Sequence, residues 1–332
     1  MCLVGAAAEG DLGLGEADIV QVDAGMIDEH FEQLGLPSLL SDLEIDTYVN
    51  TTFSVPALKT TRHQVSFIHD VVFEDRPELV EPGLCEYLQR SSRFAASHAD
   101  RVITVSEHSR RRICAVYGLE PERVAVVRNG VTKPEAMPTE GHVEDARARL
   151  GVSRPYVLYV GSLEPKKGIP ELLEAFARLT ADGFTGQLVL AGGKAGPPYD
   201  VDAHVATHGI TDRVNMLGYV SEEDKQCLMA GCELFVYPSR YEGFGLPPLE
   251  ALAFGKPCVV TDATSLPEVV GDCALMARSE DTESLTETMK RGLADAGYRE
   301  HAREAGPAWA AEFTWERAAR EFLDVLDSLE TN

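Results

Sequence analysis

The sequence has little positive charge and no long hydrophobic stretch. Lysine and arginine number 30 against 54 aspartates and glutamates in the 332 residues, which gives a formal net charge of −24. A surface of this charge repels the phosphates of nucleic acids and of anionic lipids, so we expect neither as a partner. No apolar run reaches the ~18 residues of a membrane-spanning helix. The first residues also lack the basic segment of a secretory signal. We therefore expect neither a membrane-spanning helix nor such a signal.

Cysteine is scarce, and its positions match no common metal-binding spacing. The seven cysteines are an odd number and are scattered along the chain. Cys227 and Cys232 are five residues apart, which is not the spacing of zinc ligands, and we expect both in the core. Scattered free thiols are typical of a reducing compartment, which predicts a cytoplasmic protein without a metal site.

Short apolar runs alternate with amphipathic segments from end to end. With 44% hydrophobic and 25% charged residues, a chain of this length is expected to form two domains. The alternation indicates parallel sheets with crossover helices, that is, doubly wound α/β domains. In the first half we expect strands at Asp18–Val22, Thr47–Asn50, Val65–Ile68, Arg101–Val105 and Val124–Val127, and helices at Gly83–His98 and Glu107–Tyr117.

The second half repeats this pattern after a proline-containing segment, Thr132–Gly141, which is expected to be a linker. We therefore expect domains at 1–138 and 139–312, facing each other across a cleft, followed by an amphipathic segment at 313–332. Expected strands are Tyr156–Val160, Leu188–Ala191, Val214–Leu217, Leu234–Tyr237, Cys258–Thr261 and Ala274–Ala277; expected helices are Ile169–Thr180, Ser221–Ala230, Pro248–Phe254 and Asp281–Leu293.

The N-terminal region departs from the pattern. A doubly wound domain normally opens with an apolar strand and a glycine-rich turn, but no convincing strand precedes the glycines of Gly10–Gly15. We expect a flexible terminus there and a first domain that lacks its opening strand. No Gly-x-Gly-x-x-Gly motif opens a βαβ unit, which argues against a nicotinamide-dependent dehydrogenase.

The most informative segment is Val236–Ala251, with the sequence VYPSRYEGFGLPPLEA. A buried strand is expected to end near Tyr237, and two adjacent prolines then open a helix. Gly243 and Gly245 allow the backbone to approach a ligand closely. The helix N-terminus suits an anion such as a diphosphate. Its donors are the backbone N–H groups of Phe244, Gly245 and Leu246.

Two carboxylates, Glu242 and Glu250, flank this anion site at an interval of eight residues. A carboxylate accepts hydrogen bonds from vicinal hydroxyls, so one acid suits a sugar and the other a ribose. The structural alternative is a helix N-terminus that acidic residues stabilise.

Two further segments place polar residues directly after predicted strands. Gly161 ends one strand, and Lys166 and Lys167 follow it ahead of a helix, where a lysine neutralises a leaving diphosphate. His69 and Asp70 follow another strand, at the position of a cleft. Solvated lysines at a helix start, and a histidine without function, are the alternatives.

Together these segments resemble the retaining glycosyltransferases of family 4 (group 1), which have the two-domain GT-B fold. The resemblance extends from about Leu34 to Leu329. The run from Glu242 to Glu250 is similar to that family's E-x7-E motif, and Gly161–Gly168 is similar to its diphosphate-binding loop. Further landmarks occur in the same order at Ile68–Asp70, Thr104–Glu107, Asn129–Val131 and Leu266–Val269.

The resemblance implies a role for each matching residue. Glu242 would contact hydroxyls of the donor sugar, Glu250 the ribose and Lys167 the diphosphate, with His69 beside the transferred sugar. Tyr219 and Val220 would lie at the nucleotide base, and the final helix, Phe313–Leu329, would cross back to the first domain. Gly161, Lys166 and the segment from Gly243 to Leu246 complete the expected donor site.

Two departures from the family pattern affect the expected site. Ser162 stands where many members have an arginine, and Lys166 replaces another, so phosphate binding depends more on Lys167. The family also begins with a strand and a glycine-rich loop, and judged by the position of His69 about 40 residues of that opening are absent.

The implied reaction is transfer of a hexose-type sugar from a UDP- or GDP-linked donor to a hydroxyl acceptor, with the anomeric configuration retained. The acceptor would be a glycan, a lipid-linked molecule or a small molecule, in the synthesis of a polysaccharide, glycolipid or glycoconjugate. The resemblance implies no metal and no cofactor besides the donor, because Lys167 and the backbone amides supply positive potential. The alternative is a nucleotide-binding protein that is non-catalytic or depends on a partner. A pyridoxal-dependent phosphorylase shares the fold, but the flanks of the E-x7-E motif argue against it.

Overall fold

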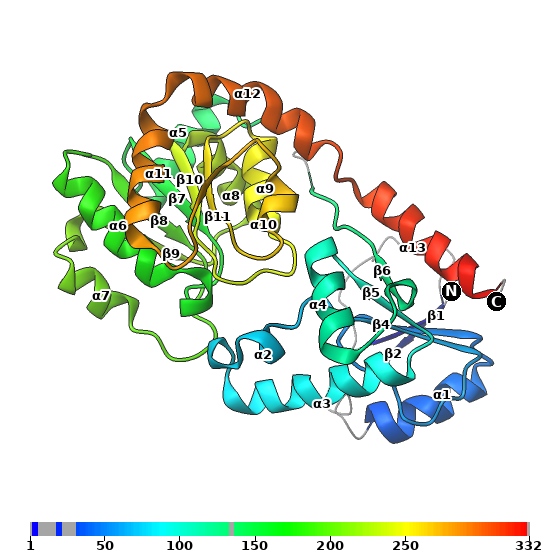
Figure 1. The fold of residues 1–332 in the computed structure, drawn as a ribbon. Coiled ribbons are helices and arrows are strands. Elements are labelled where there is room, and N and C mark those ends of the chain that lie inside the picture. Colours follow the sequence, from blue (N-terminus) through cyan, green and yellow to red (C-terminus); the bar gives the residue numbers. More distant parts are fainter. Residues whose placement is uncertain (1, 6–17, 22–30, 133–135, 331–332) are drawn as a thin grey trace.

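The computed structural model describes residues 2–5, 18–21, 31–132 and 136–330, which form two lobes (Figure 1). Each lobe has a parallel sheet with helices packed on it. The first sheet has the strand order β3-β4-β5-β6, and the second has the order β12-β11-β10-β7-β8-β9. Two doubly wound α/β lobes are therefore confirmed.

The strands of the first sheet are β3 (Thr47–Asn50), β4 (His63–Phe67), β5 (Arg101–Thr104) and β6 (Val124–Val126). Its lobe contains the helices α1 (Leu36–Asp42), α2 (Val72–Asp75), α3 (Pro82–His98) and α4 (Glu107–Tyr117). Helix α4 shows why the boundaries were predictable. The side chain of Ser106 accepts a hydrogen bond from the N–H of Ser109 at its start, and Gly118 ends it with φ +67°.

The strands of the second sheet are β7 (Tyr156–Val160), β8 (Gln187–Ala191), β9 (Val214–Gly218), β10 (Leu234–Tyr237), β11 (Cys258–Thr261) and β12 (Leu275–Ala277). The helices are α5 (Glu140–Leu150), α6 (Ile169–Ala181), α7 (Val201–Thr207), α8 (Glu222–Gly231), α9 (Leu246–Ala253), α10 (Leu266–Val270), α11 (Thr282–Ala294) and α12 (Ala296–Ala310). Every residue of β10 and β11 is buried, as expected of central strands covered on both faces.

The last helix, α13 (Trp315–Glu330), returns to the first lobe (Figure 1). Its apolar side packs on the first sheet, where Ala318 and Leu329 share a core cluster with Val65 and Ile103. Before it, the N–H of Val131 donates to the carbonyl of Phe313 at 3.0 Å, so the two connections between the lobes run together.

Two expectations about the elements were wrong. A strand does precede the Gly10–Gly15 fragment: β1 (Cys2–Gly5) pairs in parallel with β2 (Asp18–Gln21), in a two-stranded sheet separate from the first sheet. The glycine fragment itself lies outside the described residues. Helix α5 begins at Glu140, inside the segment expected as linker, because the side chain of Thr139 caps it.

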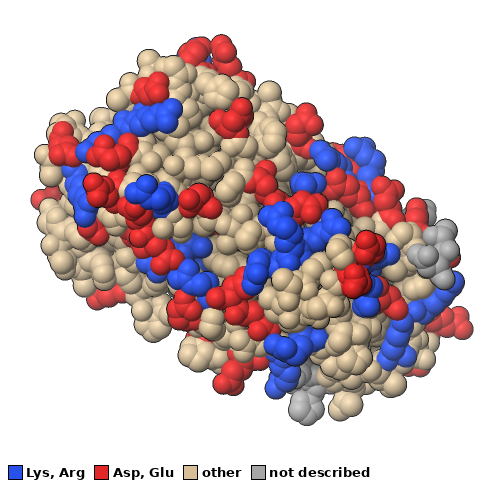
Figure 2. All heavy atoms as spheres, viewed as in Figure 1, with Lys and Arg blue, Asp and Glu red and all other residues tan. Residues whose placement is uncertain are grey.

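Among the described residues, no helix is both long and apolar enough to cross a membrane. On the face drawn in Figure 2, acidic and basic side chains are interspersed over both lobes.

Candidate functional site

The loop after β10 carries Glu242 and is held by hydrogen bonds from the loop after β11. Thr264 Oγ1 lies 2.9 Å from both the backbone N and the backbone O of Glu242. Ser265 Oγ donates to the carbonyls of Glu242 and Phe244, at 3.0 and 2.8 Å. Thr264 adopts φ +50°, a conformation that β-branched residues rarely adopt, so the local backbone is strained where it holds Glu242.

Glu242 forms a buried cluster with a lysine and a tyrosine from neighbouring strands. Its Oε1 accepts from Lys167 Nζ at 2.6 Å and from the hydroxyl of Tyr237 at 2.9 Å. Lys167 also lies 3.2 Å from the Tyr237 hydroxyl. Glu242 is only 9% exposed, so this ion pair lies largely out of water.

Each charge of this pair stabilises the other. Burial raises the pKa of Glu242, but the positive charge and hydrogen bond of Lys167 outweigh it, so the pKa lies below the ordinary value. Burial likewise lowers the pKa of Lys167, and Glu242 outweighs it, so that pKa lies above its ordinary value. Glu242 and Lys167 are therefore both ionised at neutral pH.

Lys167 is positioned by a tight contact between two loops. It ends the short helical turn Pro165–Lys167, and Gly168 follows with φ +71°. A Cβ atom on Gly168 would lie 1.9 Å from the carbonyl oxygen of Pro238, so a glycine is needed for the two loops to meet. The backbone N–H of Arg240 also donates to the carbonyl of Lys166 at 2.8 Å.

The N-terminus of α9 presents unpaired backbone donors beside this cluster. Gly245 precedes the helix with φ +110°, a conformation suited to glycine. Within the described chain, no acceptor takes a hydrogen bond from the N–H groups of Phe244, Gly245 or Leu246. The helix starts at Leu246, two residues before the predicted start, which places these three groups at its first turn. This arrangement suits an anion.

Glu250 lies on α9 and pairs with a lysine that the sequence analysis did not consider. Lys225 Nζ on α8 lies 2.8 Å from Glu250 and 2.9 Å from Glu222. Burial raises the pKa of Glu250 above its ordinary value, although Lys225 acts in the opposite direction. Glu250 therefore forms its own ion pair with Lys225, distinct from the pair of Lys167 and Glu242.

The first lobe brings His69 and Asp70 against the same loop. A Cβ atom on Gly243 would lie 2.8 Å from the carbonyl oxygen of His69 and 3.2 Å from Asp70 Oδ2. His69 Nε2 lies 3.0 Å from the carbonyl oxygen of Thr51. Gly243 thus allows contact between the two lobes directly beside Glu242.

Asp70 is the residue that sequence reasoning undervalued. Its Oδ1 accepts from the N–H of Val72 at 3.0 Å. Burial raises its pKa, against the smaller opposing effects of that hydrogen bond and of Lys166 and Lys167. The signal was available, since Asp70 directly follows His69 at a strand end, but only the structure shows that it faces the lysines of the other lobe.

The remaining predicted residues line the loops after β7, β8 and β9. Gly161 has φ +151°, and its carbonyl oxygen would lie 1.9 Å from a Cβ on Gly192. The side chain of Lys166 forms no ion pair within the described residues. Tyr219 is 89% exposed, and its ring packs over Gly193, while Val220 packs against the core. The structure thus gathers the predicted residues at the carboxyl ends of the strands.

Contacts between the lobes close one side of this site. The side chain of Tyr241 lies in the core of the first lobe, and its hydroxyl donates to Asp75 Oδ2 at 2.8 Å. The carboxylate of Glu268, on α10, accepts from the N–H groups of Glu107 and His108 at 2.9 and 3.1 Å. Glu268 therefore caps helix α4 of the opposite lobe. Its position in the first turn of α10 does not by itself indicate this role.

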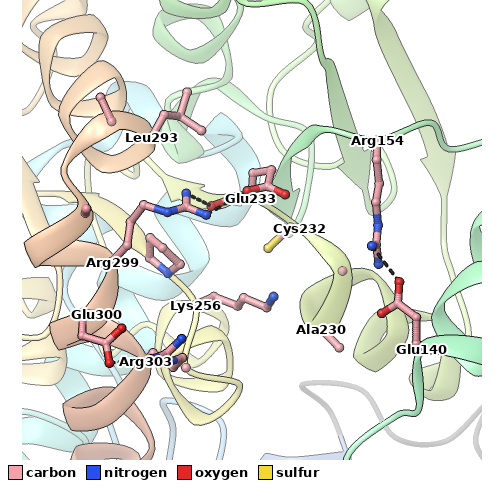
Figure 3. A pocket seen from close by; sticks show the side chains of 15 residues that line it. Glu140, Arg154, Ala230, Cys232, Glu233, Lys256, Leu293, Arg299, Glu300 and Arg303 are labelled. Carbon is pink, nitrogen blue, oxygen red and sulfur yellow. Dashed lines mark hydrogen bonds and ion pairs between the residues drawn. The ribbon is translucent and has the colours of Figure 1, made fainter.

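A cavity of 630 Å³ lies elsewhere, at the amino ends of the second sheet's strands (Figure 3). Arg154, Glu233 and Lys256 line it, just before β7, β10 and β11 respectively. Arg154 pairs with Glu140, and Arg299 pairs with Glu233 (Figure 3). Because the predicted residues follow the same strands, this cavity lies at the opposite edge of the sheet from them.

Known proteins match both halves of the chain. The sequence model described as "Glycosyl transferases group 1" matches residues 143–309, and the one described as "Glycosyltransferase Family 4" matches residues 35–133. The O-antigen chain mannosyltransferase B of Escherichia coli is 31% identical over 80% of this chain and 70% of its own length. The MMP alpha-(1->4)-mannosyltransferase of Mycolicibacterium hassiacum is 32% identical over 70% of this chain, which spans 55% of that relative.

A solved structure supports the same fold. HepE of Anabaena, in complex with UDP and glucose, superimposes with a TM-score of 0.74 at 20% identity. The match covers 95% of this chain and 86% of that one, so this chain shares the two-lobed GT-B fold.

Proposed function

The chain belongs to the group 1 glycosyltransferases of family 4, and from this premise we propose that it transfers a hexose from a nucleoside-diphosphate sugar to a hydroxyl acceptor, with retention of anomeric configuration. The acceptor we propose is a glycan or glycoconjugate. The observation that carries the proposal is the buried Lys167–Glu242–Tyr237 cluster beside the unpaired donors of α9.

The donor diphosphate would bind between Lys167 and the N–H groups of Phe244, Gly245 and Leu246. These groups are fixed before any ligand binds, so they stabilise charge that develops on the leaving phosphate without reorganisation. A phosphate oxygen of the donor would then take the proton of the incoming hydroxyl. We propose that Lys167 and the amides supply the positive charge and that no metal ion is required for the transfer.

The flanking residues would orient the donor. Glu242, held by Lys167, would accept hydrogen bonds from hydroxyls of the sugar, with His69 and Asp70 on its other side. Glu250 would accept from the ribose while Lys225 balances its charge. The exposed ring of Tyr219 and the backbone at Val220 would contact the base. The contact of Gly243 with His69 supports this arrangement, because it brings both lobes to one point.

Mannose is the first sugar to test. Both relatives described above are named as mannosyltransferases. We therefore propose GDP-mannose as the first candidate donor and UDP-glucose as the second. We also propose that 1–138 and 139–312 act as the acceptor and donor domains in a reducing, cytoplasmic compartment, with 313–332 joining them.

The test combines binding and turnover. We expect one of a panel of GDP- and UDP-linked hexoses to raise the unfolding temperature, and the same donor to be consumed when hydroxyl acceptors are added. Glu242→Ala and Lys167→Ala should each lower transfer by at least about 100-fold. Lys290→Ala and Glu287→Ala, which break a surface pair on α11, are the matched controls and should leave transfer unchanged.

Two outcomes would count against this function. Near-wild-type turnover in Glu242→Ala or Lys167→Ala would remove the assignment of the site. Tight binding of UDP or GDP without transfer, across the whole donor and acceptor panel, would favour the alternative of a nucleotide-binding protein that is non-catalytic or depends on a partner.

A further inference from the structure

Three side chains that commonly ligate metals meet in the second lobe, outside the site described above. Asp272, Cys273 and His301 each offer one ligand atom, and these atoms lie within 4.8 Å of one another. Asp272 and Cys273 lie in the turn after α10, and His301 lies on α12. Because 27 residues separate the cysteine from the histidine, no local spacing in the sequence indicates the cluster.

The backbones that carry these side chains are held against each other. Tyr298, one helical turn before His301, donates from its hydroxyl to the carbonyl of Cys258 at 2.7 Å and contacts that of Cys273 at 3.4 Å. Trp309, two turns after His301, donates from Nε1 to the carbonyl of Val269 at 2.7 Å. These anchors lie on both sides of His301, so helix and turn are fixed relative to each other without a ligand.

The three side chains have few other partners. Cys273 is 2% exposed, and its Sγ lies 3.7 Å from Asp272 Oδ1. Asp272 and His301 are exposed. Within the described part of the chain, no lysine or arginine pairs with Asp272 and no hydrogen bond engages His301. Both side chains are therefore free to rotate toward the thiol.

We propose that Cys273, His301 and Asp272 bind a Zn²⁺ ion through sulfur, imidazole nitrogen and carboxylate oxygen, with water in the fourth position. Zinc accepts this mixed set in tetrahedral geometry, in which ligand atoms lie about 3.5 Å apart. The present atoms lie within 4.8 Å of one another, and rotation of the two exposed side chains would bring them to that spacing. On binding, the thiol releases its proton to solvent and forms the zinc–sulfur bond.

The bound ion would join α12 to the turn that follows α10. Helix α10 carries Glu268, which caps α4 across the lobes, so the ion would also stabilise the base of that contact. Zinc would therefore raise the stability of the protein without entering the transfer reaction.

The experiment is a Co²⁺ titration of the full chain, kept reduced with a phosphine. We expect the near-ultraviolet absorption of a thiolate bound to Co²⁺, saturating at one ion per chain and removed by added Zn²⁺. Cys273→Ser should abolish this absorption, and His301→Ala and Asp272→Asn should each weaken binding by at least about tenfold. Cys227→Ser, which changes a buried thiol on α8, is the matched control and should behave as wild type.

Thermal unfolding of each metal-free variant shows whether it is folded. In the folded proteins, Zn²⁺ should raise the unfolding temperature of wild type and Cys227→Ser but not of Cys273→Ser. No absorption in the reduced wild type, full absorption in folded Cys273→Ser, or loss of it in folded Cys227→Ser would each overturn the proposal. If the reduced wild type shows no absorption, Cys273 is simply a small apolar residue of the core.

Discussion

Glu242 and Lys167 show how two charges can be kept ionised in a site with little water. Each would be costly to bury alone, because a charge that leaves water loses its hydration. They lie 2.6 Å apart, and Tyr237 adds a hydrogen bond to the same carboxylate oxygen. Both charged groups are therefore available to interact with a bound ligand.

A double-variant cycle separates the structural and functional roles of this pair. Lys167→Met leaves the buried carboxylate of Glu242 without its cation, and Glu242→Gln leaves the ammonium of Lys167 without its anion. Each single variant should cost about 3–5 kcal/mol of unfolding free energy. The double variant Lys167→Met/Glu242→Gln should regain most of that stability and none of the transfer. Denaturant unfolding beside a turnover assay measures both. A stability loss in the double variant equal to the sum of the two single losses would contradict the pairing.

The pH dependence of the pair follows from the direction of its two pKa shifts. Because the pKa of Glu242 is lowered, its contribution to stability is present above the ordinary glutamate value of 4.5 and is lost as the pH falls through the lowered value. Because the pKa of Lys167 is raised, its contribution is present below 10.5 and is lost as the pH rises through the raised value. The stability difference between wild type and the double variant should therefore be constant from about pH 5.5 to about pH 9. A marked slope inside that window, measured by denaturant unfolding at several pH values, argues against an ionised pair.

Gly243 offers a test of the contact between the lobes. Gly243→Ala places a methyl group 2.8 Å from the carbonyl oxygen of His69, so the lobes must separate slightly. We expect transfer to fall by at least about tenfold, because a small displacement of groups near the reaction is costly. Gly141→Ala, where the nearest atom is 3.7 Å away on the start of α5, is the control and should keep full activity. Unchanged transfer in Gly243→Ala would show that this contact is not needed.

At the scale of elements, the sequence pattern predicted the strand boundaries that neighbouring residues determine. Strands such as Tyr156–Val160 and Cys258–Thr261 were predicted to the residue, because buried runs of β-branched and aromatic residues end at clear turn signals. Helix α5 was missed, because the prolines before it dominate the local pattern. Glu242 and Lys167 were predicted as site residues because each follows a predicted strand, and the structure brings their side chains together.

What the sequence did not reveal depends on contacts between distant segments. Nothing near Lys225 indicates that it pairs with Glu250, and nothing near Tyr241 indicates that its ring enters the core of the other lobe. The cap of α4 by Glu268 joins residues 161 positions apart. Such partners are set by how the lobes pack, which local periodicity does not encode.

The cap of α4 leads to a prediction at the same scale. Glu268→Ala removes the acceptor of the first two N–H groups of α4, which should cost about 1–2 kcal/mol locally. Hydrogen exchange should become faster at Glu107 and His108, whose N–H groups donate to Glu268, and stay unchanged in α3. Glu283→Ala, at the start of α11, serves as a control on a helix that the other lobe does not cap. Equal exchange in wild type and Glu268→Ala would mean that the two lobes do not touch there in solution.

At the scale of the whole molecule, an acidic chain places two adjacent lysines where an anion would bind. The net charge is −24, yet Lys166 and Lys167 and the amides of α9 meet at the mouth of the second lobe. The first lobe contacts Tyr241, Gly243 and Glu268 of the second lobe beside this region, so the two lobes meet around the proposed donor site.

A crystal structure with UDP or GDP bound tests this account most directly. We predict that the diphosphate contacts Lys167 Nζ and the N–H groups at the start of α9, with the ribose at Glu250. A diphosphate seated in the cavity at the amino ends of the strands, or one that leaves Lys167 and α9 untouched, would contradict it.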